Sequence, residues 1–167
     1  MNTIDSILQT LAEYLASAPA LREAAFVTEY PAGYKSYPLK KPTVSVGLKS
    51  LAMDAGSFGG YLGRDAATGN DIMGQQVKME VLLSCYFPSE TSGLDCYKLV
   101  TLLSQTLVDG CPVGGLSELT VEPIRYDSNT SACRADVTLR LKTVVGTQKD
   151  ERLVEDFILI HRPSGGA

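Results

Sequence analysis

The order in which helical and strand periodicities follow one another constrains the fold of this chain most. A helical pattern of apolar residues comes first, alternating patterns follow, a second helical pattern interrupts them, and further alternation completes the series. The segments are, in that order, 3–17 (helix), 24–30, 43–51 and 75–87 (strands), 93–109 (helix), and 119–126 and 135–142 (strands). This succession predicts an α+β domain with two helices packed on a mostly antiparallel or mixed sheet of about five to six strands.

The size and charge of the chain limit the classes of protein to which it can belong. With 167 residues and a hydrophobic fraction of 44%, it can bury one substantial core. Its net charge of −4 and pI of about 5.0 argue against a general nucleic-acid binder, which needs a basic face. Lys35, Lys40 and Lys41 form the densest basic cluster, and we interpret them as a solvated loop rather than a phosphate site.

The four cysteines indicate free thiols rather than a metal site. Cys85, Cys96, Cys111 and Cys133 lie too far apart for a paired C-x-x-C zinc arrangement. The N-terminus lacks the basic-then-apolar layout of a signal peptide, so a cytosolic, reducing location is expected. Cys85 falls in a strand pattern and Cys96 in a helix pattern, where each is expected to be a small buried hydrophobe. No apolar run approaches the roughly 18 residues of a membrane span.

The second helix is predicted to be more buried than the first. Ser92 followed by Asp95 predicts a capped N-terminus, and Gly110 fits the left-handed position that often ends a helix. Leu94, Leu102 and Val108 add apolar surface to the flanks of its apolar stripe. Apolar residues around more of the circumference predict that more of the helix is covered.

Residues 75–87 form the clearest strand pattern. The opposite face of this strand is polar at Lys78 and becomes apolar toward Tyr86, which indicates that a second element or a subunit covers that end. Segments 119–126 and 135–142 predict a hairpin, in which Pro123 marks an edge or a bulge. The core-facing positions of the 75–87 strand are predicted to be Val77, Met79, Val81, Leu83, Cys85 and Phe87.

Three further segments carry candidate contact residues or unusual composition. Residues 52–74 hold six glycines, which predicts a long loop without a fixed regular element. Its Gly56-to-Gly63 spacing lacks the lysine–serine pair and the order of a phosphate loop, so nucleotide binding is not predicted. Tyr34 and Tyr37 lie in a Pro-rich loop, where they either form a contact surface or cover the edge of the core.

The C-terminal region differs in character from the rest. A polar stretch begins at Gly146 and is followed by an apolar strand pattern over 153–160. We therefore divide the chain into a domain, 1–146, and an extension, 147–167, whose end is expected to fray. The apolar strand either pairs within its own sheet or with the edge of a neighbouring subunit. Its candidate inter-subunit residues are Phe157, Ile158, Leu159 and Ile160.

The sequence contains no recognisable catalytic constellation. His161 is the only histidine and lies next to the fraying end, where it is a poor candidate for a general base. Asp54, Asp65 and Asp71 do not match the spacing of a calcium loop. No serine sits in a G-x-S-x-G turn. The expectation is a protein without enzymatic activity, cofactor or metal, which acts through surfaces.

The order of elements, together with two strand motifs, resembles a known family. The motifs are Lys41-Pro42-Thr43-Val44-Ser45-Val46 at the start of one strand and Val77-Lys78-Met79-Glu80-Val81 in the strand before the Leu-rich helix. Over roughly residues 3–145 the chain resembles the tail terminator (tail completion) proteins of tailed bacteriophages and related contractile particles. The resemblance implies a homohexameric ring that caps the tail tube and later joins the head. It further implies a virion protein, assembled in the bacterial cytoplasm, without cofactor or catalytic residues.

Under this resemblance, the long glycine-rich loop would reach a ring neighbour or the tube. Ordering it would cost about 1–2 kcal/mol per fixed residue, which contacts made on assembly must offset. The implied partners are further copies of the chain, the tube protein, possibly the sheath, and neck or head connectors, with no membrane and no sequence-specific nucleic acid. Alternatives are a head-completion or neck connector, and a small ligand-binding or enzymatic domain with a pocket under the loop. The candidate assembly residues of the loop are Phe58, Tyr61, Leu62, Arg64, Ile72 and Met73.

Overall fold

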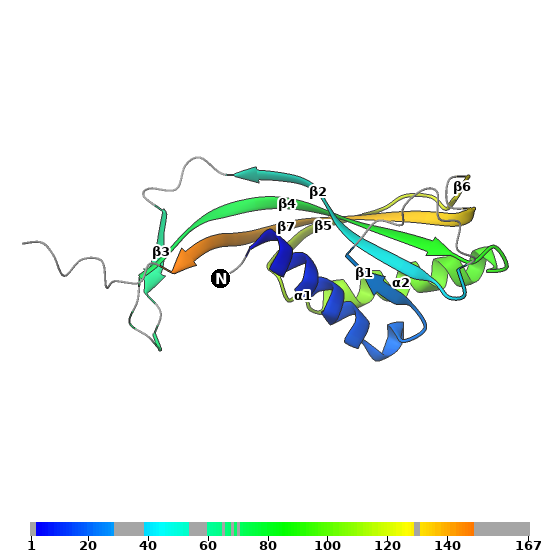
Figure 1. The fold of residues 1–167 in the computed structure, drawn as a ribbon, viewed down its shortest axis with the longest axis horizontal. Coiled ribbons are helices and arrows are strands. Elements are labelled where there is room, and N and C mark those ends of the chain that lie inside the picture. The colour runs from blue at the N-terminus through cyan, green and yellow to red at the C-terminus, as the bar shows by residue number, and fades with distance from the viewer. Residues whose placement is uncertain are drawn as a thin grey trace, which may run out of the picture.

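The computed structural model describes residues 3–28, 39–53, 60–64, 66–67, 69, 71–128 and 131–148. Within these ranges, two α-helices and a short 3-10 helix lie beneath one mixed seven-stranded sheet (Figure 1). The elements are α1 (Ile4–Ser17), η1 (Pro19–Leu21), β1 (Ala25–Val27), β2 (Thr43–Met53), β3 (Tyr61–Arg64), β4 (Asp71–Phe87), α2 (Gly93–Asp109), β5 (Gly115–Val121), β6 (Arg125–Asp127) and β7 (Ala132–Gln148). The predicted α+β class is confirmed.

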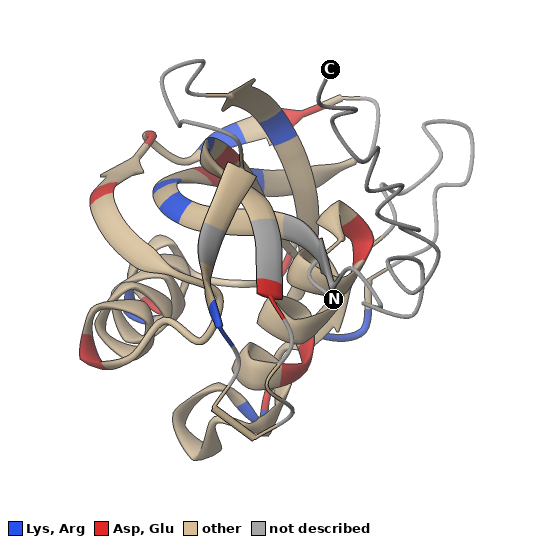
Figure 2. Ribbon diagram, turned by 90° about the vertical axis from the view of Figure 1, so that its left-hand side faces the viewer, with Lys and Arg blue, Asp and Glu red and all other residues tan. Residues whose placement is uncertain are grey.

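The sheet is built around its two longest strands, β4 and β7. The strand order is β1-β2-β4-β7-β5, while β3 also pairs with β4 and β6 also pairs with β7. β1 runs parallel to β2, and every other pairing in the described residues is antiparallel. The predicted hairpin is confirmed, because β5 and β6 both pair with β7 and Pro123 lies in the break between them. Figure 2, which looks along the strands, shows the sheet curving over the two helices.

Local sequence signals account for the ends of both helices. Thr3 caps α1 in a reciprocal capping box with Ser6, and α1 ends at Ser17 before Pro19. The predicted cap of α2 is confirmed, since the Ser92 side chain accepts the Asp95 amide at 3.2 Å. The prediction for Gly110 is wrong. Its φ of −176° is extended backbone, so α2 ends without a left-handed residue.

One face of the sheet and the inner faces of the helices form the core. All six predicted inward positions of β4 are buried, and in the middle of the sheet their register partners are buried too, as Val46 and Val137 are opposite Leu83. On the helix side of this core, α1 contributes Leu11 and Leu15, both of which are fully buried. Alternate residues of each strand point to the helix side of the sheet, and each helix turns one apolar stripe toward the sheet. These two apolar surfaces pack together and form the core.

The predicted burial of the flanks of α2 is wrong at two of its three positions. Leu94 and Val108 are 83% and 69% exposed, whereas Leu102 is half-buried and packs against the core. Periodicity along one helix records which residues are apolar, whereas burial depends on whether another element reaches that face. The buried stripe is Cys96, Leu99, Val100, Leu103 and Leu107.

The expectation that 52–74 lacks regular structure is wrong for its described parts. β2 continues to Met53, β3 lies inside the segment, and β4 begins at Asp71. Gly60 and Gly63 have φ values of 70° and 142°, and a register shift separates Tyr61 from Gly63 in the β3–β4 pairing. The glycines at these points therefore supply a turn and a bulge within a strand pair, rather than preventing strands from forming.

The C-terminal division falls inside a strand. β7 continues through Gln148, which pairs with Ile72, so the boundary after Gly146 interrupts a continuous ladder. The predicted strand over 153–160 lies outside the described residues, as do Tyr34, Tyr37 and His161. Among the helices of the described chain, none has the length and apolarity that crossing a membrane requires.

Candidate assembly surface

The most distinctive feature of the molecule is a strand extension that continues beyond the helices (Figure 1). It consists of β3 with the adjoining ends of β4 (Asp71–Gln76) and β7 (Val144–Gln148), and we call it the β-tongue. The pair Val77 and Thr143, 0% and 7% exposed, is the last cross-strand pair in which both side chains are buried before the tongue begins. Beyond it, the described residues are held by main-chain pairing and by Val145, which is half-buried and packs against the core.

The tongue is nearly neutral. Its charged residues are Arg64 and Asp71, which form an ion pair with an N–O distance of 3.1 Å. The Arg64 side chain is 62% exposed and the Asp71 side chain is 37% exposed. Such an exposed pair contributes little stability. Tyr61 is 56% exposed and Val144 36%, so apolar surface faces solvent there. A narrow ribbon without its own core is only marginally stable in water, and burial against a partner would stabilise it.

The structure brings five of the six predicted loop residues together, but on strands. Tyr61, Leu62 and Arg64 lie on β3, and they face the part of β4 that holds Ile72 and Met73. The register pairs Tyr61 with Met73. Phe58 lies outside the described residues. A short apolar run flanked by turn glycines, around Tyr61 and Leu62, was the available signal for a strand.

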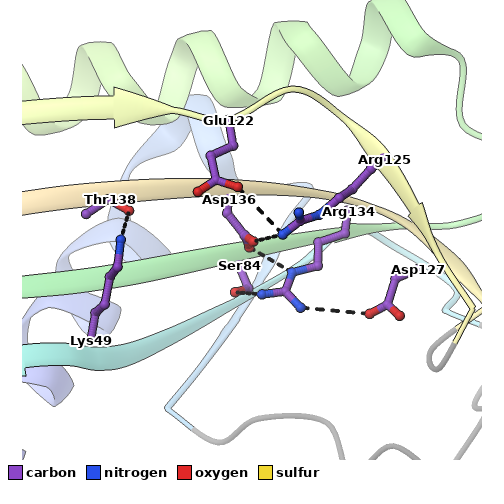
Figure 3. Close-up of polar contacts among 8 residues, drawn as sticks. All are labelled: Lys49, Ser84, Glu122, Arg125, Asp127, Arg134, Asp136 and Thr138. Carbon is purple, nitrogen blue, oxygen red and sulfur yellow. Dashed lines mark hydrogen bonds and ion pairs between the residues drawn. The ribbon is translucent and has the colours of Figure 1, made fainter.

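A cluster of ion pairs around the buried Asp136 lies on the other face of the sheet, near the end opposite the tongue (Figure 3). Asp136 is 4% exposed, and its carboxylate accepts hydrogen bonds from Arg134 Nε at 2.8 Å and from Arg125 Nη2 at 3.0 Å. Burial lowers the pKa of Arg134, but its hydrogen bond and ion pair with Asp136 outweigh burial and raise that pKa overall. Arg134 also donates to Ser84 Oγ at 3.2 Å.

The same cluster covers the apolar end of the outer face of β4. The Arg134 guanidinium lies 5.5 Å from the centre of the Tyr86 ring, a cation–π distance, and Tyr86 is 4% exposed. The predicted covering element is therefore, at least in part, an arginine from the neighbouring strand β7. Burial is the main cause of the raised pKa of Tyr86. The sequence signal that was missed is the i, i+2 spacing of Arg134 and Asp136, which puts both on one strand face.

A second charged ladder crosses three strands nearer the tongue. Arg140 on β7 donates to Glu80 on β4 at 2.7 Å and also to Glu118 on β5. The hydrogen bond from Arg140 is the main cause that lowers the pKa of Glu80. A hollow of about 250 Å³ beside the ladder is lined by charged residues that include Lys78, Glu80, Arg140 and Lys142. Of these, Glu80 and Arg140 form an ion pair with each other.

The remaining reactive groups do not assemble into a site within the described ranges. Burial raises the pKa of the Cys85 thiol to about 12, on the core side of the sheet. No group of three or more His, Cys, Asp or Glu residues that could hold a metal ion occurs among the described residues. A hollow of about 410 Å³ near the start of α2 is lined by a mixture of acids and lysines, including Glu23, Lys40 and Asp95.

Comparison with known proteins finds similarity at the level of structure. No protein-family model and no curated protein matches the sequence. The chain overlaps the sheath/tube terminator of an extracellular contractile injection system (PVC, extended state) with a TM-score of 0.47 and 11% identity, over 90% of this chain and 59% of that one. It overlaps the tube-terminating cap of the anti-feeding prophage with a TM-score of 0.49 and 12% identity, over 89% and 57%.

Both matched proteins belong to the terminator or cap class that the sequence resembles. The chain spans 57–59% of their lengths, so each contains a large part without a counterpart here. Overlaps this loose do not assign a role.

Proposed function

We propose that this chain is a structural subunit that ends the tail tube of a phage or of a related contractile particle. The observation that carries the proposal is the β-tongue, a neutral set of paired strands that continues past the helix-covered core. The sequence resemblance to tail terminators supports the same role. The chain acts by docking, with no catalytic step and no cofactor.

The tongue suits docking for a physical reason. Its strands are preformed, so contact with a tube would immobilise less chain than the ordering of an unstructured loop. Tyr61 and Val144 offer apolar area at its surface. A buried tyrosine covers about 150–250 Å², and each 100 Å² of apolar area contributes roughly 2.5 kcal/mol at most. The Arg64–Asp71 pair leaves no net charge to desolvate at the contact.

The proposal has finer parts that belong to the same hypothesis. The subunits form a homohexameric ring on the end of the tube, contact the sheath where one exists, and then join the neck or head connector. The protein is accordingly a component of the virion or particle, assembled in the bacterial cytoplasm. These parts derive from the family resemblance.

The test uses tail tubes prepared without this chain and the purified protein. We expect wild-type protein to cap tube ends in negative-stain images. The double variant Tyr61→Ser, Val144→Ser should cap far fewer, because it removes the apolar surface of the tongue. Tyr97→Ser is the matched control, since Tyr97 is 53% exposed on α2 and away from the tongue.

Circular dichroism and thermal unfolding establish that each variant is folded before capping is scored. If the double variant caps tubes as well as the wild type, the tongue is not the docking element. If wild-type protein binds isolated heads or necks and ignores tubes, the connector alternative replaces the terminator proposal.

A further inference from the structure

Among the described residues, the sheet has two open edges of similar length on opposite sides. β1 pairs with β2 only at Thr43–Ser45, so the span Val46–Met53 has no strand on that side among the described residues. At the other end of the order, β5 (Gly115–Val121) pairs with β7 on one side alone. Open edges present unpaired amides and carbonyls that favour the addition of another strand.

The directions of the two edge strands fit each other. β2 is antiparallel to β4, β4 to β7, and β7 to β5. Three reversals make β2 and β5 run in opposite directions within one copy. When a second copy is placed beside the first in the same orientation, β5 of one lies antiparallel to β2 of the next. That is the more stable way to pair neighbouring strands.

The side chains along the two edges match on both faces. On the helix side, Leu48 and Val121 are 36% and 40% exposed, although their register partners Val81 and Val137 are buried core. Each edge therefore leaves an apolar residue at the margin of the same core layer. Joining two copies would cover both residues and continue the core across the contact.

Each edge strand carries a single charged residue on the other face of the sheet, and the two residues have opposite signs. Lys49 is the one charged residue of β2, and its amino group donates to Thr138 on the outer face. Glu118 is the one charged residue of β5, and it meets Arg140 on the same face. Opposite signs on the two edge strands avoid the like-charge repulsion that a contact between two copies of the same edge would bring.

We propose that copies of this chain join head to tail, with the β5 edge of one pairing antiparallel with the Val46–Met53 edge of β2 in the next. The partner at each edge is a second copy of this chain. A heterologous contact of this kind generates a closed ring when the rotation between copies closes. The proposal rests on the proposed function, because it names the contact that builds the ring, while the tongue remains available for the tube.

One variant blocks the β5 edge with little effect on its own ladder. Glu122 donates its amide to the Asp136 carbonyl at 2.8 Å, and successive amides of a strand point to alternate sides. The Val121 amide therefore points away from β7, and Val121→Pro removes only that outward donor. Val121→Thr is the matched control, because it keeps the amide and the β-branched shape.

A second variant blocks the other edge. Leu48→Lys puts a charge at the margin of the core on β2, where a neighbour would have to bury it. Leu48→Thr is its matched control. If Val121→Pro does not fold by circular dichroism, Leu48→Lys carries the test alone.

Size-exclusion chromatography with light scattering at micromolar concentration, and negative-stain imaging on tube ends, measure the assemblies. Wild type and both threonine controls should form rings, and each blocked variant should remain monomeric at concentrations at least tenfold higher. Mixed in equal amounts, the two blocked variants should form a heterodimer and no ring, because one β2 edge and one β5 edge remain competent.

The outcomes separate the two proposals. Rings formed by Val121→Pro or by Leu48→Lys would overturn the edge contact and leave the proposed function standing. Homodimers of either blocked variant would show that like edges pair, which also overturns it. A wild-type protein that forms no ring in solution or on tubes would overturn both.

Discussion

Residue by residue, the charges of the outer face serve the structure. Asp136 is the one buried charged side chain among the described residues. Its oxygens accept hydrogen bonds from Arg134 on β7 and from Arg125 at the start of β6. A buried carboxylate held in this way is costly to leave without its partners. We therefore assign Asp136 to the stability of that end of the sheet.

Cys85 gives a prediction for the dependence of stability on pH. Burial raises its pKa to about 12 in the folded protein, whereas an unfolded thiol titrates near 8.5. Between these values the unfolded chain binds fewer protons, so stability falls as pH rises, by up to about 1.4 kcal/mol per pH unit. Below the unfolded pKa, this contribution is fully present.

Urea unfolding from about pH 8 to about pH 10.5 measures this slope. We expect the free energy of unfolding to fall more steeply with pH in the wild type than in Cys85→Ala. The alanine variant is less stable throughout, so the slopes are compared and not the absolute values. Parallel slopes would mean that the Cys85 thiol ionises in the folded state as readily as in the unfolded state.

Within single elements, α2 separates what a helical pattern can and cannot predict. Its cap and its buried stripe follow from the sequence, because they depend on residues a few positions apart. The exposure of Leu94 and Val108 does not, since no local pattern records which faces other elements reach. The tongue was missed for a similar reason, because the strands around Tyr61 and Asp71 depend on pairing with partners elsewhere in the chain.

Two leucines of α2 test this distinction within one helix. Leu103 is fully buried, so Leu103→Ala should lower the free energy of unfolding by about 2–5 kcal/mol through the cavity it leaves. Leu94 is 83% exposed, and Leu94→Ala should change it by less than about 0.5 kcal/mol. Both are measured by urea unfolding. A large loss with Leu94→Ala would mean that another part of the chain covers that face.

For the whole molecule, the arrangement implies that stability is unevenly distributed along the same strands. The middle of β4 pairs with β2 and β7 and lies over the helices, whereas Gly74–Gln76 pair with β7 alone among the described residues. Local opening costs least where few apolar contacts and few ladder bonds must break. One continuous strand therefore joins a stable core to a labile tongue.

Hydrogen exchange followed by mass spectrometry tests this gradient and connects it to assembly. In the free protein, amides of Gly74–Gln76 should exchange at least about 100-fold faster than those of Val81–Cys85, a difference of roughly 2.7 kcal/mol in opening free energy. The matching comparison on β7 is 145–148 against 137–141. On capped tubes, the tongue should become protected while the core changes little, because docking supplies the contacts that the tongue lacks. Uniform protection along β4 in the free protein would instead make the tongue part of the core, and its docking role would lose its physical basis.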